Sequence, residues 1–176
     1  MPHIHTAPGQ HDHTVSMYIF RIDFNEPKVM LHMHKKIGAY AQFGGHIELD
    51  ENPWQTIEHE LAEETGYDMK QVQILQPTNR KAHITSAIVH PYPIVYSTMG
   101  YPNNKTHLHI DSAYAFITNE SPLNLPQEGE STELRLFTRE EAATSSSIDV
   151  ITRDTALYIF DNCLTDWQPV STKDFE

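Results

Sequence analysis

The sequence predicts an α/β fold in which a mixed sheet lies between helices. The chain has 176 residues, of which 39% are hydrophobic and 20% charged, a composition that suits one soluble domain spanning residues 1–176. Segments rich in β-branched and aromatic residues occur before and after a stretch with clear helix-start and helix-stop signals. A second stretch with helical spacing of apolar residues follows near the end. This order of elements is typical of a sheet covered by helices on both faces.

The first part of the chain contains the strands that lead to the central motif. Residues 1–12 carry prolines, a glycine and several histidines, and we expect an irregular arm there. Strands are predicted at 14–22 and at 28–34, joined by a turn at 25–27, and a short strand at 40–43 follows.

Four further strands are expected in the middle of the chain, at residues 71–76, 84–90, 94–97 and 106–118. A loop is expected at residues 121–131, a short strand at 134–137, and a capping box at 138–141 that opens a brief helix. A terminal helix is expected at 149–164, and residues 165–176 are a polar tail without assigned structure.

The best-defined element is a helix over residues 53–65. Asn52 is a good N-cap, Pro53 suits the first helical position, and Gln55 completes a capping box. Gly66 can take the left-handed conformation that ends a helix.

This helix has an acidic stripe beside an apolar one. At 100° per residue the apolar stripe contains Trp54, Ile57 and Leu61, and the acidic stripe contains Glu60, Glu63 and Glu64. Each pair of like charges at such spacing costs the helix roughly a few tenths of a kcal/mol. Because Mg²⁺ prefers oxygen ligands and bridges carboxylates to phosphates, the stripe indicates a metal site. The alternative is a solvated helix face.

The residues before the helix favour the metal site. Gly44 and Gly45 permit a tight turn whose backbone approaches a ligand closely, and Glu51 lies at the turn into the helix. The glycines, this acid and the helix acids form one loop-helix unit.

The loop-helix unit resembles the signature of the Nudix hydrolase family. The signature is Gly, five residues, Glu, seven residues, Arg-Glu, an aliphatic residue, any residue, Glu-Glu, any residue, Gly and an apolar residue. It is matched at Gly45, Glu51, Glu60, Leu61, Glu63, Glu64, Gly66 and Tyr67. His59 stands where the family has Arg, and it is shorter, less basic and lacks the planar fork.

The resemblance implies an α/β/α sandwich and a metal-dependent hydrolase that cleaves the diphosphate linkage of a nucleoside diphosphate derivative by water attack on phosphorus. The cofactor would be Mg²⁺ or Mn²⁺. Its ligands would be the three helix glutamates and a backbone carbonyl of Gly44 or Gly45. Glu60 or an acid from a late loop would deprotonate the water, Glu51 would support the loop, and His59 would hold a helix carboxylate in place.

Residues outside the motif are candidates for the rest of the site. Lys35 and Lys36 either contact phosphate or form a solvated turn. His107, His109 and Asp111 alternate along an expected strand, so they share one face and could line a cavity or complete a metal shell. Several Nudix enzymes place an extra acid from a late loop at the metal or the attacking water, and Glu130 or Glu133 could do so here.

The net charge, the cysteine count and the lengths of the apolar runs argue against several other functions. A formal net charge of −12 argues against duplex nucleic acid as a partner. Cys163 is the only cysteine, which excludes an intramolecular disulfide and suits a reducing compartment. No apolar run approaches the roughly 18 residues of a membrane span, and no signal peptide is evident, so we expect a cytoplasmic protein. A monomer and a homodimer are both compatible with the sequence.

Two rival functions use the same fold. In the first, the chain is a ligand-binding or regulatory module that binds metal and nucleotide but is catalytically weak. In the second, it resembles the isoprenoid diphosphate isomerases, which need a reactive cysteine in the active site. Cys163 is expected in the terminal helix, which disfavours the isomerase.

Overall fold

The computed structural model describes residues 10–175 except 79–83, 85 and 102–103, and for residues 101 and 104–107 it describes the backbone alone. The strands are β1 His11–Arg21, β2 Lys28–His34, β3 Ala39–Ala41, β4 Phe43–His46, β5 Gln73–Gln76, β6 Val95–Tyr101, β7 Asn104–Thr118, β8 Leu134–Thr138 and β9 Gln168–Ser171. The helices are α1 Pro53–Thr65, α2 Arg139–Thr144, α3 Val150–Tyr158 and α4 Leu164–Asp166, with 3₁₀ turns η1 Met69–Gln71 and η3 Thr172–Phe175 and a π turn η2 Ile159–Cys163.

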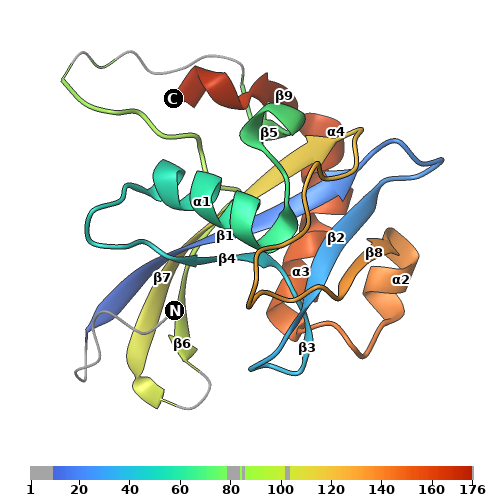
Figure 1. Ribbon diagram of the computed structural model, residues 1–176, viewed down its shortest axis with the longest axis horizontal. Helices are drawn as coiled ribbons and strands as arrows, with labels where there is room; N and C mark the ends of the chain where they lie inside the picture. The colour runs from blue at the N-terminus through green and yellow to red at the C-terminus, as the bar shows by residue number, and fades with distance from the viewer. Residues whose placement is uncertain (1–9, 79–83, 85, 102–103, 176) are drawn as a thin grey trace.

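The described strands form one mixed sheet (Figure 1). Its main path is β3-β2-β1-β7-β5-β9, while β4 pairs with β1, β6 with β7 and β8 with β2. The long central strands β1 and β7 run parallel, and the other pairs are antiparallel. β1 therefore has β7 along one edge and β4 and β2 along successive parts of the other edge.

Helices cover both faces of this sheet, which confirms the predicted α/β/α sandwich. On one face, called the α1 face, Val15, Met17 and Ile19 of β1 pack with the apolar stripe of α1. On the other, called the α3 face, Tyr18 and Phe20 pack with buried residues of α3 and η2. The alternation follows from the two-residue period of a strand.

The ends of α1 are those predicted. Asn52 accepts hydrogen bonds from the backbone N–H groups of Trp54 and Gln55, and the Gln55 side chain accepts from the N–H of Asn52. Gly66 ends the helix with φ +74°, and a Cβ there would lie 2.1 Å from the carbonyl oxygen of Asn124. Local capping chemistry thus fixes both ends of the helix.

Three sequence predictions are wrong in part. The expected arm at residues 1–12 ends earlier, because β1 already begins at His11; residues 1–9 lie outside the described residues. The described part of 84–90 is not a strand, and Ile84 and Ile88 are exposed. The expected polar tail contains β9, which pairs with β5, and buries Val170 and Phe175.

Smaller differences concern boundaries. The strand expected at 40–43 is divided between β3 and β4. The expected terminal helix has a π turn after α3, and η1 replaces the start of the strand expected at 71–76. Along the described residues, no helix combines the length and apolar character needed to cross a membrane.

Candidate active site

The paired glycines bring the backbone of β4 close to β1 and to α1. Gly44 has φ +133°, and a Cβ at this position would lie 2.0 Å from the backbone oxygen of Val15 on β1. Only glycine fits such a conformation and such an approach. The N–H of Gly44 donates a 2.7 Å hydrogen bond to Oε2 of Glu64, so the glycine turn and α1 are joined directly.

Glu60 and Glu64 are buried carboxyl groups on the same side of α1. Glu60 is 5% exposed and Glu64 8% exposed. Burial, aided by the neighbouring acids, raises the pKa of Glu60 to about 7 and that of Glu64 to about 8. A carboxylate removed from water is costly unless a cation or hydrogen bonds compensate. In the metal-free protein these two groups therefore keep their protons to a higher pH than exposed glutamates do.

His59 bridges two acids at the rim of the site. Its Nε2 lies 3.0 Å from Oε1 of Glu63, one turn along α1, and its Nδ1 lies 3.2 Å from Oε1 of Glu51. The other oxygen of Glu51 accepts a 2.9 Å hydrogen bond from the hydroxyl of Thr56. Burial lowers the pKa of His59, but the charge of Glu63 and the bonds to both acids outweigh it, so the net shift is upward. Because both ring nitrogens face carboxylates, the protonated ring suits this position.

His32 of β2 also lies beside the site, and sequence reasoning missed it. Its Nδ1 lies 3.9 Å from Oε1 of Glu64, too far for a hydrogen bond. Burial lowers the pKa of His32 to about 4, so the ring is neutral and does not form an ion pair with Glu64. The alternation of β2, which places His32 on the same face as buried Met30, is the sequence signal that could have identified it.

The loop after β7 runs along α1 and brings Glu130 toward the acids. The N–H of Gln127 donates to the carbonyl of Glu63 over 2.8 Å. The charge of Glu130 contributes to the raised pKa values of Glu60 and Glu64. Of the two late-loop candidates, Glu130 is thus the one whose charge reaches the buried acids.

The other late-loop candidate and the two lysines differ in their surroundings. Glu133 instead accepts a 2.7 Å hydrogen bond from the hydroxyl of Tyr40. Lys35 donates to the carbonyl of Gly129 over 2.6 Å, so it holds the loop near the site. Lys36 is exposed in the turn between β2 and β3.

His109 and Asp111 share one face, as the alternation predicts, but it is the α3 face. Asp111 accepts hydrogen bonds from the hydroxyls of Thr14 and Ser16, at 2.7 Å and 3.0 Å. His109 lies beside His46. The side chain of His107 lies outside the described residues. The structure therefore separates His109 and Asp111 from the glutamates of α1.

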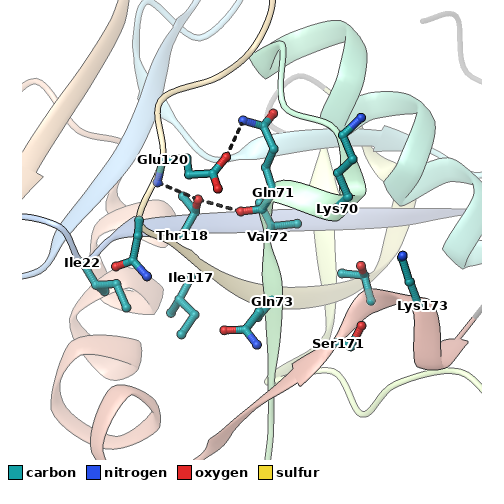
Figure 2. A pocket seen from close by; sticks show the side chains of 12 residues that line it. Ile22, Lys70, Gln71, Val72, Gln73, Ile117, Thr118, Glu120, Ser171 and Lys173 are labelled. Atoms are coloured by element: carbon teal, nitrogen blue, oxygen red, sulfur yellow. Dashed lines mark hydrogen bonds between the residues drawn. The ribbon is translucent and has the colours of Figure 1, made fainter.

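A hollow of about 300 Å³ lies between η1, the end of β7 and the start of η3 (Figure 2). Its lining includes Lys70, Thr118 and Lys173, and Gln71 donates a 3.2 Å hydrogen bond to Glu120 there. None of the residues predicted for the site lines it. It therefore adds nothing to the candidate active site.

The acids of α1 fit a divalent cation. Oε1 of Glu60 is buried and has no hydrogen-bond partner among the described atoms. Glu64 is buried next to it, and Glu63 stands at the partly exposed rim. Oxygen ligands of this kind are those that Mg²⁺ and Mn²⁺ prefer, and a cation would offset the cost of burying ionised carboxylates.

The sheet between helices, with a glycine turn joined to an acidic helix, is the arrangement expected for the Nudix signature. A comparison with models of protein families matches residues 12–155 of this chain to the NUDIX domain. The chain therefore belongs to the Nudix family, and it is a Nudix-type pyrophosphohydrolase. This confirms the resemblance found in the sequence.

Solved structures agree with this family. A NUDIX-family hydrolase from Clostridium perfringens is 28% identical with a TM-score of 0.68, and the match covers 85% of this chain and 96% of that chain. Ap4A hydrolase from C. elegans is 14% identical with a TM-score of 0.59, covering 86% and 97%. The NUDIX domain of Shewanella oneidensis NrtR, in complex with ADP ribose, is 15% identical with a TM-score of 0.60, covering 89% and 90%. No significant match was found among curated proteins.

Proposed function

We propose that the protein cleaves the diphosphate linkage of a nucleoside diphosphate derivative in a reaction that depends on Mg²⁺ or Mn²⁺. The observation that carries this proposal is the pair of buried carboxyl groups of Glu60 and Glu64 beside the backbone of Gly44, in the helix of the Nudix signature. Two similar structures have Ap4A or ADP ribose in their names, and in both compounds an adenosine is linked to a second group through a chain of phosphates that contains phosphoanhydride bonds. They support a substrate of this class.

The cation would be held by Glu60, Glu63 and Glu64 together with a backbone carbonyl of Gly44 or Gly45. When bound, a divalent ion of this kind neutralises charge on phosphate oxygens and makes water a better nucleophile. The hydrogen bond from Gly44 fixes the orientation of Glu64. His59 is a positioning residue, since it holds Glu63 and Glu51 from either side of its ring.

Removal of a proton from the attacking water requires a further base. Glu60 and Glu130 are the two candidates, because both lie close enough to affect the ionisation of Glu64. Glu60 has a pKa of about 7 in the metal-free protein, but it is also a proposed ligand of the cation, whose charge would lower this pKa. Lys35, which holds the loop of Glu130, would present its charge toward substrate phosphate.

The test is a panel of nucleoside diphosphate derivatives, incubated with the wild-type protein in Mg²⁺, in Mn²⁺ and in chelator. Product release should require the metal. Glu63→Gln, which removes a ligand charge but keeps the shape, should lower turnover by about 10²-fold or more. Glu58→Gln is the matched control, because Glu58 lies exposed on the same helix. Equal turnover in the wild type and Glu63→Gln would overturn the proposal.

A second candidate function is a regulatory module that binds a nucleotide and turns it over weakly. His59 in place of the family's Arg favours it, since a titratable ring replaces a permanent charge. Calorimetric binding and product release with the same compounds separate the two. Tight binding with only slow product release indicates the module, whereas rapid product release indicates an efficient enzyme.

A further inference from the structure

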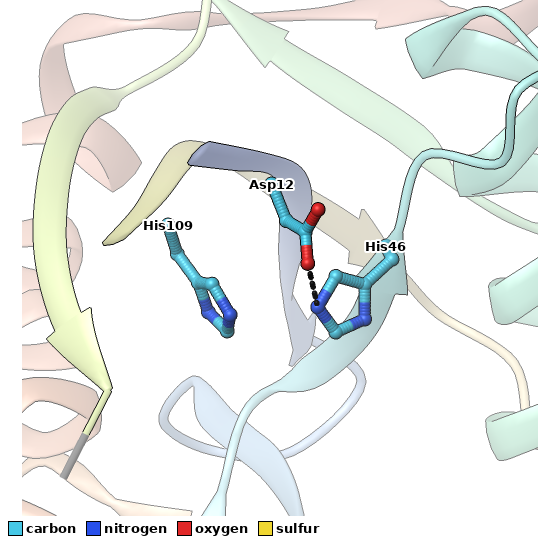
Figure 3. A group of neighbouring side chains, drawn as sticks. All are labelled: Asp12, His46 and His109. Atoms are coloured by element: carbon cyan, nitrogen blue, oxygen red, sulfur yellow. Dashed lines mark ion pairs between the residues drawn. The ribbon is translucent and has the colours of Figure 1, made fainter. Parts of the chain in front are cut away.

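Three side chains of the types that can bind a metal lie together (Figure 3). They are on the α3 face of the sheet, opposite to the face that α1 covers. Asp12, His46 and His109 each offer one ligand atom, and these atoms all lie within 4.8 Å of one another. Nε2 of His46 is 3.6 Å from Oδ2 of Asp12. The rings of His46 and His109 have centroids 5.0 Å apart and are nearly perpendicular, at 86°. Among the described residues, this is the only such group of three.

The backbone holds these residues in register on three neighbouring strands. Asp12 of β1 is the direct partner of His109 in the parallel pairing with β7. His46 at the end of β4 pairs with Thr14, two residues beyond Asp12 on β1. Residues two apart on a strand share a face, so all three side chains point to the same side. Sites built on strands are held more firmly than sites on loops.

We propose that Asp12, His46 and His109 form a second metal site, for a divalent transition-metal ion of the Zn²⁺ type. Two imidazoles and one carboxylate suit zinc and its neighbours rather than Mg²⁺, which prefers oxygen ligands. In a tetrahedral zinc site with ligands about 2.0–2.1 Å from the ion, neighbouring ligand atoms stand about 3.4 Å apart. The separation of 3.6 Å between His46 and Asp12 is close to this value.

The protein supplies three ligands, and two of them are partly exposed to solvent. Asp12 is 1% exposed, whereas His46 and His109 are partly exposed. Three protein ligands with a fourth position available to water are typical of exchangeable or reactive zinc sites rather than closed structural ones. The proposal does not rest on the function proposed above, because it uses none of the α1 glutamates and needs no substrate.

The competing explanation is an ordinary contact between a histidine and an aspartate at the strand ends. A second competitor is adventitious binding by other histidines near the N-terminus. His13 provides a control for the latter, since it lies on β1 next to Asp12 but points to the opposite face and is exposed.

The experiment uses the full chain, freed of metal with chelator and titrated with Co²⁺ in excess Mg²⁺. Calorimetry should give one tight Co²⁺ site, and the visible absorption should be that of a low-coordinate ion with nitrogen ligands. His46→Gln and His109→Gln should weaken binding at least about tenfold, while His13→Gln and Glu63→Gln retain the site. Unchanged binding in both site variants, or loss with His13→Gln, would overturn the proposal.

A second measurement uses the wild type alone, so its result does not depend on whether the variants fold. X-ray absorption of the protein with one equivalent of Zn²⁺ in excess Mg²⁺ should show scattering from two imidazole rings. A first shell of oxygen atoms without imidazole scattering would overturn the proposal.

Discussion

The Nε2 atom of His59 lies 3.0 Å from Oε1 of Glu63, one helical turn further along α1. The same ring reaches Glu51 through its other nitrogen. A histidine thus occupies the position between two acids of the site, with a charge that depends on pH. The orientation of Glu63, a proposed metal ligand, therefore depends on the protonation of His59.

Replacing His59 by Arg tests this relationship. An arginine keeps its charge at all working pH values and can bond two carboxylates with its fork. His59→Arg should raise turnover or extend activity to higher pH, and His59→Gln should lower turnover by about 10–100-fold. The measurement is the pH profile of kcat and kcat/KM. An unchanged profile, or a loss with arginine, would count against the positioning role.

The buried acids predict an unusual pH dependence for the metal-free protein. The pKa values of Glu60 and Glu64 are about 7 and about 8 in the folded state, above the ordinary 4.5. The folded protein therefore binds more protons than the unfolded chain between these values, and its stability should fall as pH rises from about 5 to 8.

Thermal unfolding in chelator across this range provides the measurement. Glu64→Gln should flatten the fall relative to wild type. Added Mg²⁺ should stabilise most at high pH, because metal ligands must be deprotonated. A variant whose pH dependence matches that of wild type would show that burial of Glu64 is not the cause.

The two late-loop acids should differ in their effect on catalysis. Glu130→Gln should lower kcat by about 10²-fold if Glu130 is the general base. Glu133→Gln is the matched control, because Glu133 is bonded to Tyr40 instead. Steady-state kinetics of both variants decides the question. A larger loss with Glu133→Gln would reverse this assignment, and full activity of Glu130→Gln would leave Glu60 as the base.

Gly44 should not tolerate a side chain. Gly44→Ala puts a Cβ against the backbone of Val15 in a left-handed conformation, which should cost about 1–3 kcal/mol or more of unfolding free energy. For a chain of this size the melting temperature falls about 2–4 °C for each kcal/mol. Gly100→Ala is the control, since nothing lies within 4 Å of its Cβ position. Equal melting temperatures for the two variants would contradict the close approach.

The parts of the molecule that local chemistry determines could be predicted from the sequence. Asn52, Gln55 and Gly66 cap α1 through bonds to residues close in the chain, so both ends of the helix were correct. The alternation of β2 likewise gave its bounds correctly. The acidic stripe on α1 also follows from helical spacing alone.

Features that depend on pairing between distant strands could not be predicted. The group of Asp12, His46 and His109 exists only because β1, β4 and β7 align in one register. β9 contains Pro169 and few apolar residues, and it is a strand because β5 offers an edge to pair with. Conversely, the apolar residues at 84 and 88 suggested a strand, but none is found there among the described residues.

The central claim is that the acids of α1 hold a divalent ion for cleavage of a diphosphate bond. Anomalous diffraction from crystals of the wild-type protein saturated with Mn²⁺ tests it most directly. A manganese peak is expected in direct contact with the carboxylates of Glu60, Glu63 and Glu64. No peak beside them at saturating Mn²⁺, with these side chains turned to bulk solvent, would contradict it.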